Sequence, residues 1–491
     1  MPLNGIYQFS ACLNRMSMEK KSNCESFISN MRLYASEKRI PFLIIFGLVQ
    51  VLIYFRILAL DNLGLNISNF VSLFLICFVF YTFSILIVNR NSESNFSIKK
   101  IFFIIIIFSI IFRIILIPLK PTLSHDMMRF LWDGRLIFHG FNPYLYTPET
   151  SELDALKDVA YFRDYEFKHT LTVYPPIVQF IFGVAYFFTD GNPFGIKLLT
   201  TIFDLMNIFI LTLLMKNVNP ENLLSGIMIY AWSPLLIIES TGNGHIEPIP
   251  IFFILLGLLL LVRRRIRLSS ISYSSACLSK LFPILLLPVF LMHLKNFGRG
   301  AIKKFLVGFI LTSSFFLIPV LLSSGLNLLR QIFWYSQNIT YNSSLYKIIE
   351  LLFPFTSTVN IARIIAYSTF IVTGLLLLRN KNLASFIEFA EGCLLLFGLF
   401  LLFTPAVFQW YLLWLLPFIA ILGIKRKNVG WFYFTAAVVL AYLPQFSFEY
   451  DVNSIALIQY LPLYAILILS AFTSNNSFKT LSDWFRLTRN R

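Results

Sequence analysis

The sequence predicts an all-α protein, a polytopic bundle of transmembrane helices with about 12–14 membrane segments. Hydrophobic residues make up 57% of the 491 residues and charged residues only 13%, whereas a soluble domain carries about 25% charged residues. The apolar residues form long runs, many of which reach the roughly 20 residues that a bilayer-spanning helix needs. Lys and Arg collect in short clusters between those runs. These observations predict an integral membrane protein without a large soluble domain.

Each membrane segment is predicted from an apolar run, and the runs are residues 41–60, 67–88, 101–118, 175–188, 196–215, 223–238, 248–262, 270–293, 302–322, 358–378, 384–403, 407–424, 429–445 and 454–472. Two of these runs are not predicted to cross. Residues 175–188 follow Tyr174-Pro175-Pro176 and form a half-embedded or outer-surface helix. Residues 270–293 are interrupted by Lys280 and Pro283 and form two short arms that return to the face they left. The result is about 12 full spans, or about 14 with the two arms.

The basic clusters set the predicted orientation, because cytoplasmic loops of membrane proteins are enriched in Lys and Arg. Residues 1–40 are then a cytoplasmic segment, residues 41–472 the transmembrane domain and residues 473–491 a basic cytoplasmic tail. The protein is a multi-pass protein of the inner cell membrane, with both termini cytoplasmic. The clusters also account for the formal charge of +16, so no nucleic-acid partner is predicted. They are Lys38-Arg39, Lys99-Lys100, Arg263 to Arg267, Lys303-Lys304, Arg379 to Lys381, Lys425 to Lys427 and Arg486 to Arg491.

One long polar loop, residues 120–195, lies on the outer face in this topology. Its first part gathers ionisable side chains that a membrane protein rarely carries without a use, namely His125, Asp126, Arg129, Asp133 and Arg135. We predict the chemistry of the protein there. A structural alternative stays open, in which residues 124–139 form an interfacial amphipathic helix, capped by Ser124 and stabilised by an Arg129–Asp133 ion pair. Asn142-Pro143-Tyr144 is predicted to end that helix in a turn.

The same face receives three other polar or aromatic segments, Glu239 to Glu247, Phe333 to Tyr341 and Phe408 to Tyr411. The topology was built only from the Lys and Arg clusters and from one ambiguous run. The gathering of these segments is therefore independent support for a functional site on the outer face.

The run SHDMMRFLWDGRLIFHGFNPYLYTPE, which begins at Ser124, resembles the first outer loop of polytopic glycosyltransferases of the GT-C superfamily. It is similar to bacterial polyprenyl-phosphate-mannose-dependent mannosyltransferases, where a loop of the form S-D-D-x-x-R-Y-x-W-D-G-x-x-x-x-G-x-N-P-Y recurs. Further similar segments follow in the family's order, at Tyr174-Pro175-Pro176, Lys197 to Asp204, Ser233 to Glu247, Lys280 to Pro283 and Thr404 to Tyr411. The sequence departs from the pattern at His125, where many relatives have an acid, at Glu247, where aspartate is common, and at Gln409, which often is proline.

The resemblance implies a GT-C-type enzyme that moves a hexose, expected to be mannose, from a polyprenyl-phosphate donor to a glycolipid or cell-envelope glycan. It implies that Asp126 is the general base, with inversion at the anomeric carbon. A lipid-phosphate donor already carries its leaving group, so a carboxylate that accepts the proton of the acceptor hydroxyl is sufficient. Arg129, Arg135 and Lys280 are the cations available for the expelled phosphate. Asp133 is placed to orient Arg129.

Further residues are predicted to contact the substrates. Glu239 and Glu247 are expected to hydrogen-bond a sugar beside His245, with helix-end capping as the structural alternative. A divalent metal at these three side chains is a less favoured alternative, so no cofactor is expected. Trp410 and Tyr411 stack on a sugar or lipid, or belong to an interfacial aromatic belt. The predicted substrate-binding residues are His125, Arg129, Asp133, Arg135, Tyr174, Glu239, His245, Glu247, Lys280, Trp410 and Tyr411.

Three other functions stay open. A transporter or flippase of polyprenyl-linked or anionic substrates needs charges along a path, but the apolar segments carry mainly Arg56, Arg113, Asp204 and Glu388, which do not form a line. A ligase that moves whole oligosaccharides shares the outer-face site. A scaffold without activity is consistent with His125 in place of an acid. The predicted partners are the lipid-linked donor, the glycolipid or glycan acceptor and membrane lipids.

Overall fold

A computed structural model describes residues 39–88, 95–159, 162, 167–353, 361–379, 381 and 383–472. Every element in this part of the chain is a helix, apart from one isolated β-bridge between Tyr341 and Ala406. The predicted all-α polytopic bundle is therefore confirmed. The predicted cytoplasmic segment 1–40, except for its last two residues, and the predicted tail 473–491 lie outside the described residues.

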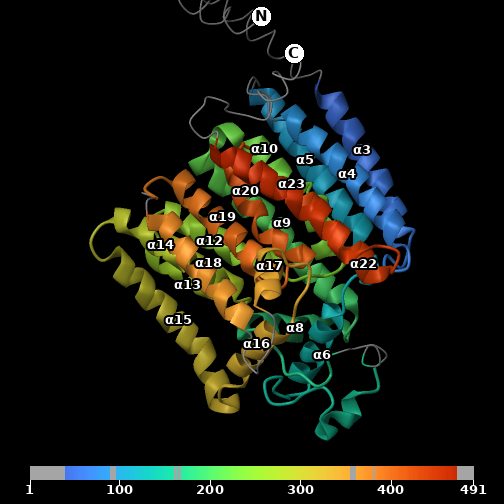
Figure 1. The fold of residues 1–491 in the computed structure, drawn as a ribbon, viewed down its shortest axis with the longest axis vertical. Helices are drawn as coiled ribbons and strands as arrows, with labels where there is room; N and C mark the ends of the chain where they lie inside the picture. Colours follow the sequence, from blue (N-terminus) through green and yellow to red (C-terminus); the bar gives the residue numbers. More distant parts are fainter. Residues whose placement is uncertain are drawn as a thin grey trace, which may run out of the picture.

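Within the described ranges, nine helical stretches are long and apolar enough to cross a membrane. Most run roughly parallel or antiparallel to one another in the bundle (Figure 1). Six are single helices: α3 (Arg39–Leu58), α4 (Ile67–Val88), α9 (Pro193–Val218), α15 (Ala301–Ser324), α18 (Ile361–Arg379) and α19 (Phe386–Phe403). A seventh is α23 (Val452–Phe472). Two are composite: η2 (Pro220–Asn222), α10 (Leu223–Ala231), α11 (Pro234–Leu236) and η3 (Ile237–Gly242) in one, and α21 (Val429–Ala437), η7 (Val438–Ala441) and α22 (Tyr442–Phe446) in the other.

The other helices are shorter or more polar. Shorter apolar ones are α8 (Pro176–Thr189), α12 (Pro248–Val262), η4 (Phe282–Leu286) with α14 (Leu287–Leu294) and η5 (Lys295–Phe297), and η6 (Gln409–Trp414) with α20 (Leu416–Leu422). The remainder are α5 (Asn95–Leu116), α6 (Asp126–Phe138), η1 (Ser151–Leu156), α13 (Ile266–Cys277), α16 (Asn327–Asn338) and α17 (Leu345–Leu352). Helix length alone does not decide how many segments cross, so the number of 12–14 stays a prediction.

Helix α8 has the length expected of a helix that does not cross. Its 14 residues span roughly 21 Å, against the roughly 30 Å of a hydrocarbon core. It packs on α6, with the rings of Phe130 and Phe182 stacked 4.8 Å apart. A short helix held against the polar loop is consistent with the predicted position at the membrane surface.

Residues 266–297 turn back on themselves, as the interruption at Lys280 and Pro283 predicts. Helix α13 ends at Cys277, and the chain returns through η4, α14 and η5. The guanidinium of Arg264, which precedes α13, lies 4.0 Å from the ring centroid of Phe297 at the end of η5. The two arms therefore start and finish beside each other, and their turn projects toward the polar loop.

Three of the predicted basic clusters, those with Arg264, Lys381 and Lys427, lie at the opposite end of the bundle from the polar loop. The end near Arg264 also holds His293, whose Nδ1 lies 2.7 Å from the Leu383 carbonyl oxygen. Lys381 and Lys427 both approach Glu391, at 3.8 and 3.6 Å. The other end holds the polar loop, α6 and α16 (Figure 1). This separation is the one the positive-inside rule requires, while the side that faces the cytoplasm stays a prediction.

Candidate active site

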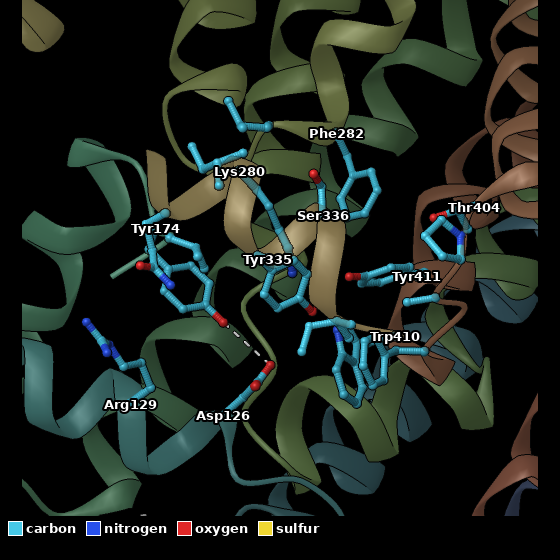
Figure 2. Close-up of a pocket in the computed structure, with 18 of the residues that line it drawn as sticks. Asp126, Arg129, Tyr174, Lys280, Phe282, Tyr335, Ser336, Thr404, Trp410 and Tyr411 are labelled. Carbon is cyan, nitrogen blue, oxygen red and sulfur yellow. Dashed lines mark hydrogen bonds between the residues drawn. The ribbon is translucent and has the colours of Figure 1, made fainter. Parts of the chain in front are cut away.

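A cavity of about 480 Å³ opens between segments that are far apart in the sequence. Its walls come from residues 123–129, 167–175, 280–285, 331–339 and 404–411. Four of these segments contain motifs of the predicted outer face, and they converge around Asp126 and Lys280 (Figure 2). The predicted site residues that line it are His125, Asp126, Arg129, Tyr174, Lys280, Trp410 and Tyr411.

Asp126 is the first residue of α6, and its carboxylate reaches the cavity. Helix α6 begins here and not at Ser124: His125 occupies the N-cap position without a side-chain cap, and Ser124 Oγ accepts a hydrogen bond from the Asp126 N–H at 3.1 Å. The predicted Ser124 cap is thus replaced by a tight turn before the helix. The Tyr174 hydroxyl donates to Asp126 Oδ2 at 3.5 Å (Figure 2). Burial raises the pKa of Asp126, while the positive charge of Lys280 opposes that rise.

Two glycines allow the close packing that places Asp126. A Cβ on Gly134 would lie 2.5 Å from the Phe182 carbonyl oxygen, so α6 approaches α8 at backbone contact. Gly244 has φ +78°, and a Cβ there would lie 2.2 Å from Met127 Cε. Glycine is required at Gly244 for both its left-handed backbone and the available space. The segment that carries His245 therefore sits directly behind the first turn of α6.

Lys280 enters the cavity from the opposite wall, in the turn between the two arms. Its ammonium forms an ion pair with Glu247 Oε1 and lies 5.8 Å from the Tyr411 ring centroid. Figure 2 shows its side chain directed toward the centre of the cavity. Burial raises the pKa of Glu247, and Lys280 opposes the rise. Glu247 is fully buried, so it holds Lys280 from behind the cavity wall.

Three of the predicted charged residues of α6 face other partners. Arg129 pairs through Nε with Asp133 Oδ1 at 2.8 Å and donates from Nη1 to the Thr170 carbonyl at 2.9 Å, and its guanidinium points away from the cavity centre in Figure 2. This is the predicted Arg129–Asp133 pair, but it is buried and not on an exposed face. Arg135 pairs with Asp158 at 2.8 Å. Asp133 and Arg135 do not line the cavity, so predicted substrate contacts for them find no support in the geometry.

His245 and Glu239 lie one layer behind the cavity. His245 Nδ1 is 3.8 Å from Asp126 Oδ2, and Nε2 is 3.4 Å from Glu239 Oε2. The Tyr442 hydroxyl donates to Glu239 Oε1 at 2.9 Å. Burial lowers the pKa of His245, and the nearby positive charge of Lys280 lowers it further. Direct sugar contacts, predicted for His245, Glu239 and Glu247, are therefore not available from these buried positions.

The same residues do not form a set of metal ligands. Glu247 is directed to Lys280, whereas His245 lies between Asp126 and Glu239. Among the residues that the structure describes, no group of three His, Cys, Asp or Glu side chains is arranged to hold a metal ion. The described residues therefore offer no ligand cluster that would support the metal alternative.

Trp410 belongs to a stack of four rings. Its indole lies 3.7 Å from the His245 ring on one side and 4.7 Å from Phe408 on the other, both nearly parallel. Phe408 in turn stacks on Tyr341 at 4.8 Å. Both faces of Trp410 are covered in this arrangement, so its stacking on a sugar stays a prediction. Only its edge meets the cavity, and Tyr411 beside it packs edge-on against Phe282 at 4.6 Å.

One wall of the cavity is formed by residues that were not among the predicted site residues. Helix α16 contributes Gln331, Ile332, Trp334, Tyr335 and Ser336, within and before the aromatic segment that the sequence places on the site face. Its C-terminal end is held by the buried Arg363, which donates to the carbonyls of Ser336 and Ile339 and to Thr340 Oγ1. The amphipathic pattern of α16 was the available signal. That pattern does not indicate what the polar face of α16 faces in the folded protein.

Residues 57–296 match the family model of the MptA_B family, described as alpha-(1->6)-mannopyranosyltransferase, N-terminal domain. The match, which covers just under half of the chain, bears out the resemblance to GT-C-type enzymes. It supports a membrane glycosyltransferase of the mannosyl-transferring class. A comparison with individually curated proteins gives no match.

The mannosyltransferase match covers only part of the cavity wall. It includes the first loop with Asp126, the His245 segment and Lys280. The wall formed by α16 and by residues 404–411 lies outside the matched range. The family match therefore does not reach the side of the cavity opposite Asp126, which only the structure describes.

Proposed function

We propose that this mannosyltransferase transfers a mannosyl group from a polyprenyl-phosphate carrier to a hydroxyl of a glycolipid or cell-envelope glycan at the outer face of the membrane. The observation that carries the proposal is the convergence of one carboxylate, Asp126, and one ammonium, Lys280, on a single cavity with largely apolar walls. A general base and a phosphate-binding cation are the two groups that such a transfer needs.

The residues that line the cavity favour a donor in which one phosphate is linked to a lipid. Aliphatic and aromatic side chains, including Phe282, Ile284, Leu285 and Phe400, line the side of Lys280 and suit an isoprenoid chain. Lys280 points to the centre, while Arg129 is engaged with Asp133 and Thr170. A single ammonium matches one phosphate better than the diphosphate of a nucleotide sugar, which usually meets several cations or a metal.

The proposed reaction is a single displacement. Asp126 takes the proton of the acceptor hydroxyl as its oxygen forms a bond to the anomeric carbon, and the bond from that carbon to the phosphate oxygen breaks. The electron pair leaves with the polyprenyl phosphate, whose added negative charge Lys280 stabilises. Attack opposite the leaving group inverts the anomeric configuration. The leaving group is already activated, so no cofactor is required by this scheme.

The test is sugar transfer by purified protein from synthetic polyprenyl-phosphate-mannose to a panel of lipid and glycan acceptors, with GDP-mannose as the alternative donor. Asp126→Asn should lower kcat at least about 100-fold, the scale of lost general-base catalysis. Asp158→Asn is the matched control, because Asp158 lies in the same loop with its side chain 72% exposed. Full activity of folded Asp126→Asn, or transfer from GDP-mannose alone, would contradict the proposal.

A transporter is the second candidate, and the described structure disfavours it. Two of the four charges that the sequence places in apolar segments, Arg113 and Asp204, form a buried ion pair at 2.7 Å. Arg113 also donates to the Ser109 and Ala231 carbonyls. These groups stabilise the packing of α5 on α9 and do not line the cavity. A liposome flip assay with the fluorescent lipid-linked donor tests this candidate.

A further inference from the structure

The contacts of His245 bear on which side chains of this cluster carry a proton. A neutral imidazole has one N–H and one lone pair, yet both ring nitrogens of His245 face carboxylates, Asp126 through Nδ1 and Glu239 through Nε2. His245 is 2% exposed and Glu239 is fully buried. Two ionised carboxylates cannot both be satisfied by one neutral ring. If both contacts are hydrogen bonds, one proton sits on a carboxylate or the ring is a buried cation.

Burial decides which carboxylate holds the proton. The Asp126 side chain is 34% exposed, whereas that of Glu239 is 0% exposed. Water stabilises the ionised form of the more exposed acid, and burial favours the neutral form of the other. Burial and Lys280 also keep the ring neutral by lowering the pKa of His245. Among the described residues, Glu239 Oε2 and His245 Nε2 are both buried polar atoms without a hydrogen-bond partner, and they lie 3.4 Å apart.

We propose that Glu239 is a neutral carboxylic acid that donates from Oε2 to His245 Nε2, and that His245 donates from Nδ1 to Asp126, so that both act as positioning residues for the base. Tyr442 donates to the other oxygen of Glu239, which leaves Oε2 as the atom that carries the proton. The inference rests on the proposed function, in which Asp126 must be ionised to accept a proton.

The arrangement assigns separate tasks to the two oxygens of Asp126. His245 and Tyr174 both approach Oδ2, so Oδ1 is left to meet the acceptor hydroxyl. The 3.8 Å from Nδ1 to Oδ2 is longer than a hydrogen bond, and such catalytic contacts commonly shorten when substrate binds. Trp410 covers one face of the imidazole at 3.7 Å and fixes the plane in which Nδ1 points.

The protonation states are tested directly by ¹⁵N NMR of histidine-labelled full-length protein in nanodiscs, with the His245 signal identified by its loss in His245→Asn. A neutral ring protonated at Nδ1 from pH 6 to 8 is expected. A ring protonated at Nε2, or an imidazolium, would overturn the inference. This readout does not depend on activity, so it stands apart from the result for Asp126→Asn.

Glu239→Gln tests the charge of Glu239 through the pH profile of kcat/KM. The titratable groups around His245 and Asp126 are His125, Tyr174, Glu239, Glu247, Lys280, Tyr335, Tyr411 and Tyr442. If Glu239 is neutral, glutamine removes no charge, and the acid limb stays at the wild-type pH. An ionised Glu239 raises the pKa of Asp126, so its removal would move the acid limb to lower pH and contradict the inference.

His245→Asn and His245→Leu separate positioning from packing. Asparagine keeps an N–H donor near the place of Nδ1, whereas leucine keeps apolar volume against Trp410 but no donor. We expect kcat of the leucine variant to fall by about 100-fold with KM little changed, the effect of a misplaced catalytic group, and the asparagine variant to recover much of it. Equal losses in both variants, with equal thermal stability, would show that His245 serves packing only.

Discussion

Lys280 shows how one side chain joins two parts of the site. It pairs with the buried Glu247 and lies over the Tyr411 ring, and it opposes the rise that burial causes in the pKa of Asp126. In the proposed reaction, Lys280 therefore favours the ionised form of Asp126 before it meets the phosphate. A sequence motif identifies Lys280, but its influence on Asp126 follows only from their meeting in one cavity.

Lys280→Met should move the acid limb of kcat/KM to higher pH. Asp126 must be ionised to act, so activity is present above its pKa and lost as the pH falls through it; removing the positive charge raises that pKa. At neutral pH we expect a loss of at least about tenfold from weaker phosphate stabilisation. Lys347→Met is the control, because Lys347 is half exposed and pairs with Glu350.

The same substitution leaves Glu247 buried without its partner, which destabilises the fold. The double variant Lys280→Met, Glu247→Gln removes that orphaned carboxylate and should recover thermal stability. An acid limb that stays at the wild-type pH in Lys280→Met itself would show that Lys280 does not lower the pKa of Asp126.

The pair α6 and α8 positions the base at the scale of elements. Gly134 and Gly183 lie in their interface, but they face different atoms. A Cβ at Gly134 meets the Phe182 carbonyl at 2.5 Å, whereas one at Gly183 meets the end of the Ile137 side chain at 2.8 Å. Backbone cannot move aside as a side chain can. The spacing of α6 and α8, and hence the position of Asp126, depends on Gly134.

Gly134→Ala should therefore destabilise the protein by about 1–3 kcal/mol, the usual cost of overpacking, and should lower kcat by displacing α6. Gly183→Ala is the matched control in the same interface and should cost less, because Ile137 can change rotamer. Thermal unfolding in detergent and initial rates measure both effects. Equal destabilisation by the two substitutions would show that the helices separate as easily at either glycine.

At the scale of the whole molecule, the bundle has a basic end and a polar, cavity-bearing end. Lys381 and Lys427 meet at Glu391, while Asn142 and Asn327 join the first loop to the end of α15 and the start of α16. A membrane enzyme that uses a lipid-linked donor places its site at one boundary of the bilayer. The positive-inside rule assigns the cavity to the outer side.

Cysteine labelling in intact cells tests this orientation. In a background without the five native cysteines, Asp158→Cys should react with a membrane-impermeant maleimide. Lys427→Cys, at the basic end, should react only after the cells are permeabilised, because a cytoplasmic thiol is shielded from the reagent. The reverse labelling pattern would place the cavity in the cytoplasm and exclude an outer-face reaction.

Sequence alone determined the features that depend on local pattern. Apolar runs predicted the helices, the Lys280–Pro283 interruption predicted the returning arms, and the first-loop motif pointed to Asp126. These succeed because hydrophobic length, proline and short motifs act over a few residues. The cavity-lining residues of α16 were not predicted, because the cavity is built from segments that are distant in the sequence.

Tertiary structure decided which charged and aromatic residues reach the cavity. Arg135 turns to Asp158, and Arg129 joins Asp133 in a buried pair. Trp410 is covered on both faces by His245 and Phe408. The direction of a side chain depends on partners contributed by other helices, and a one-dimensional pattern cannot specify them. The motif therefore predicted Asp126 as the base, while long-range packing decided which of its neighbours line the cavity.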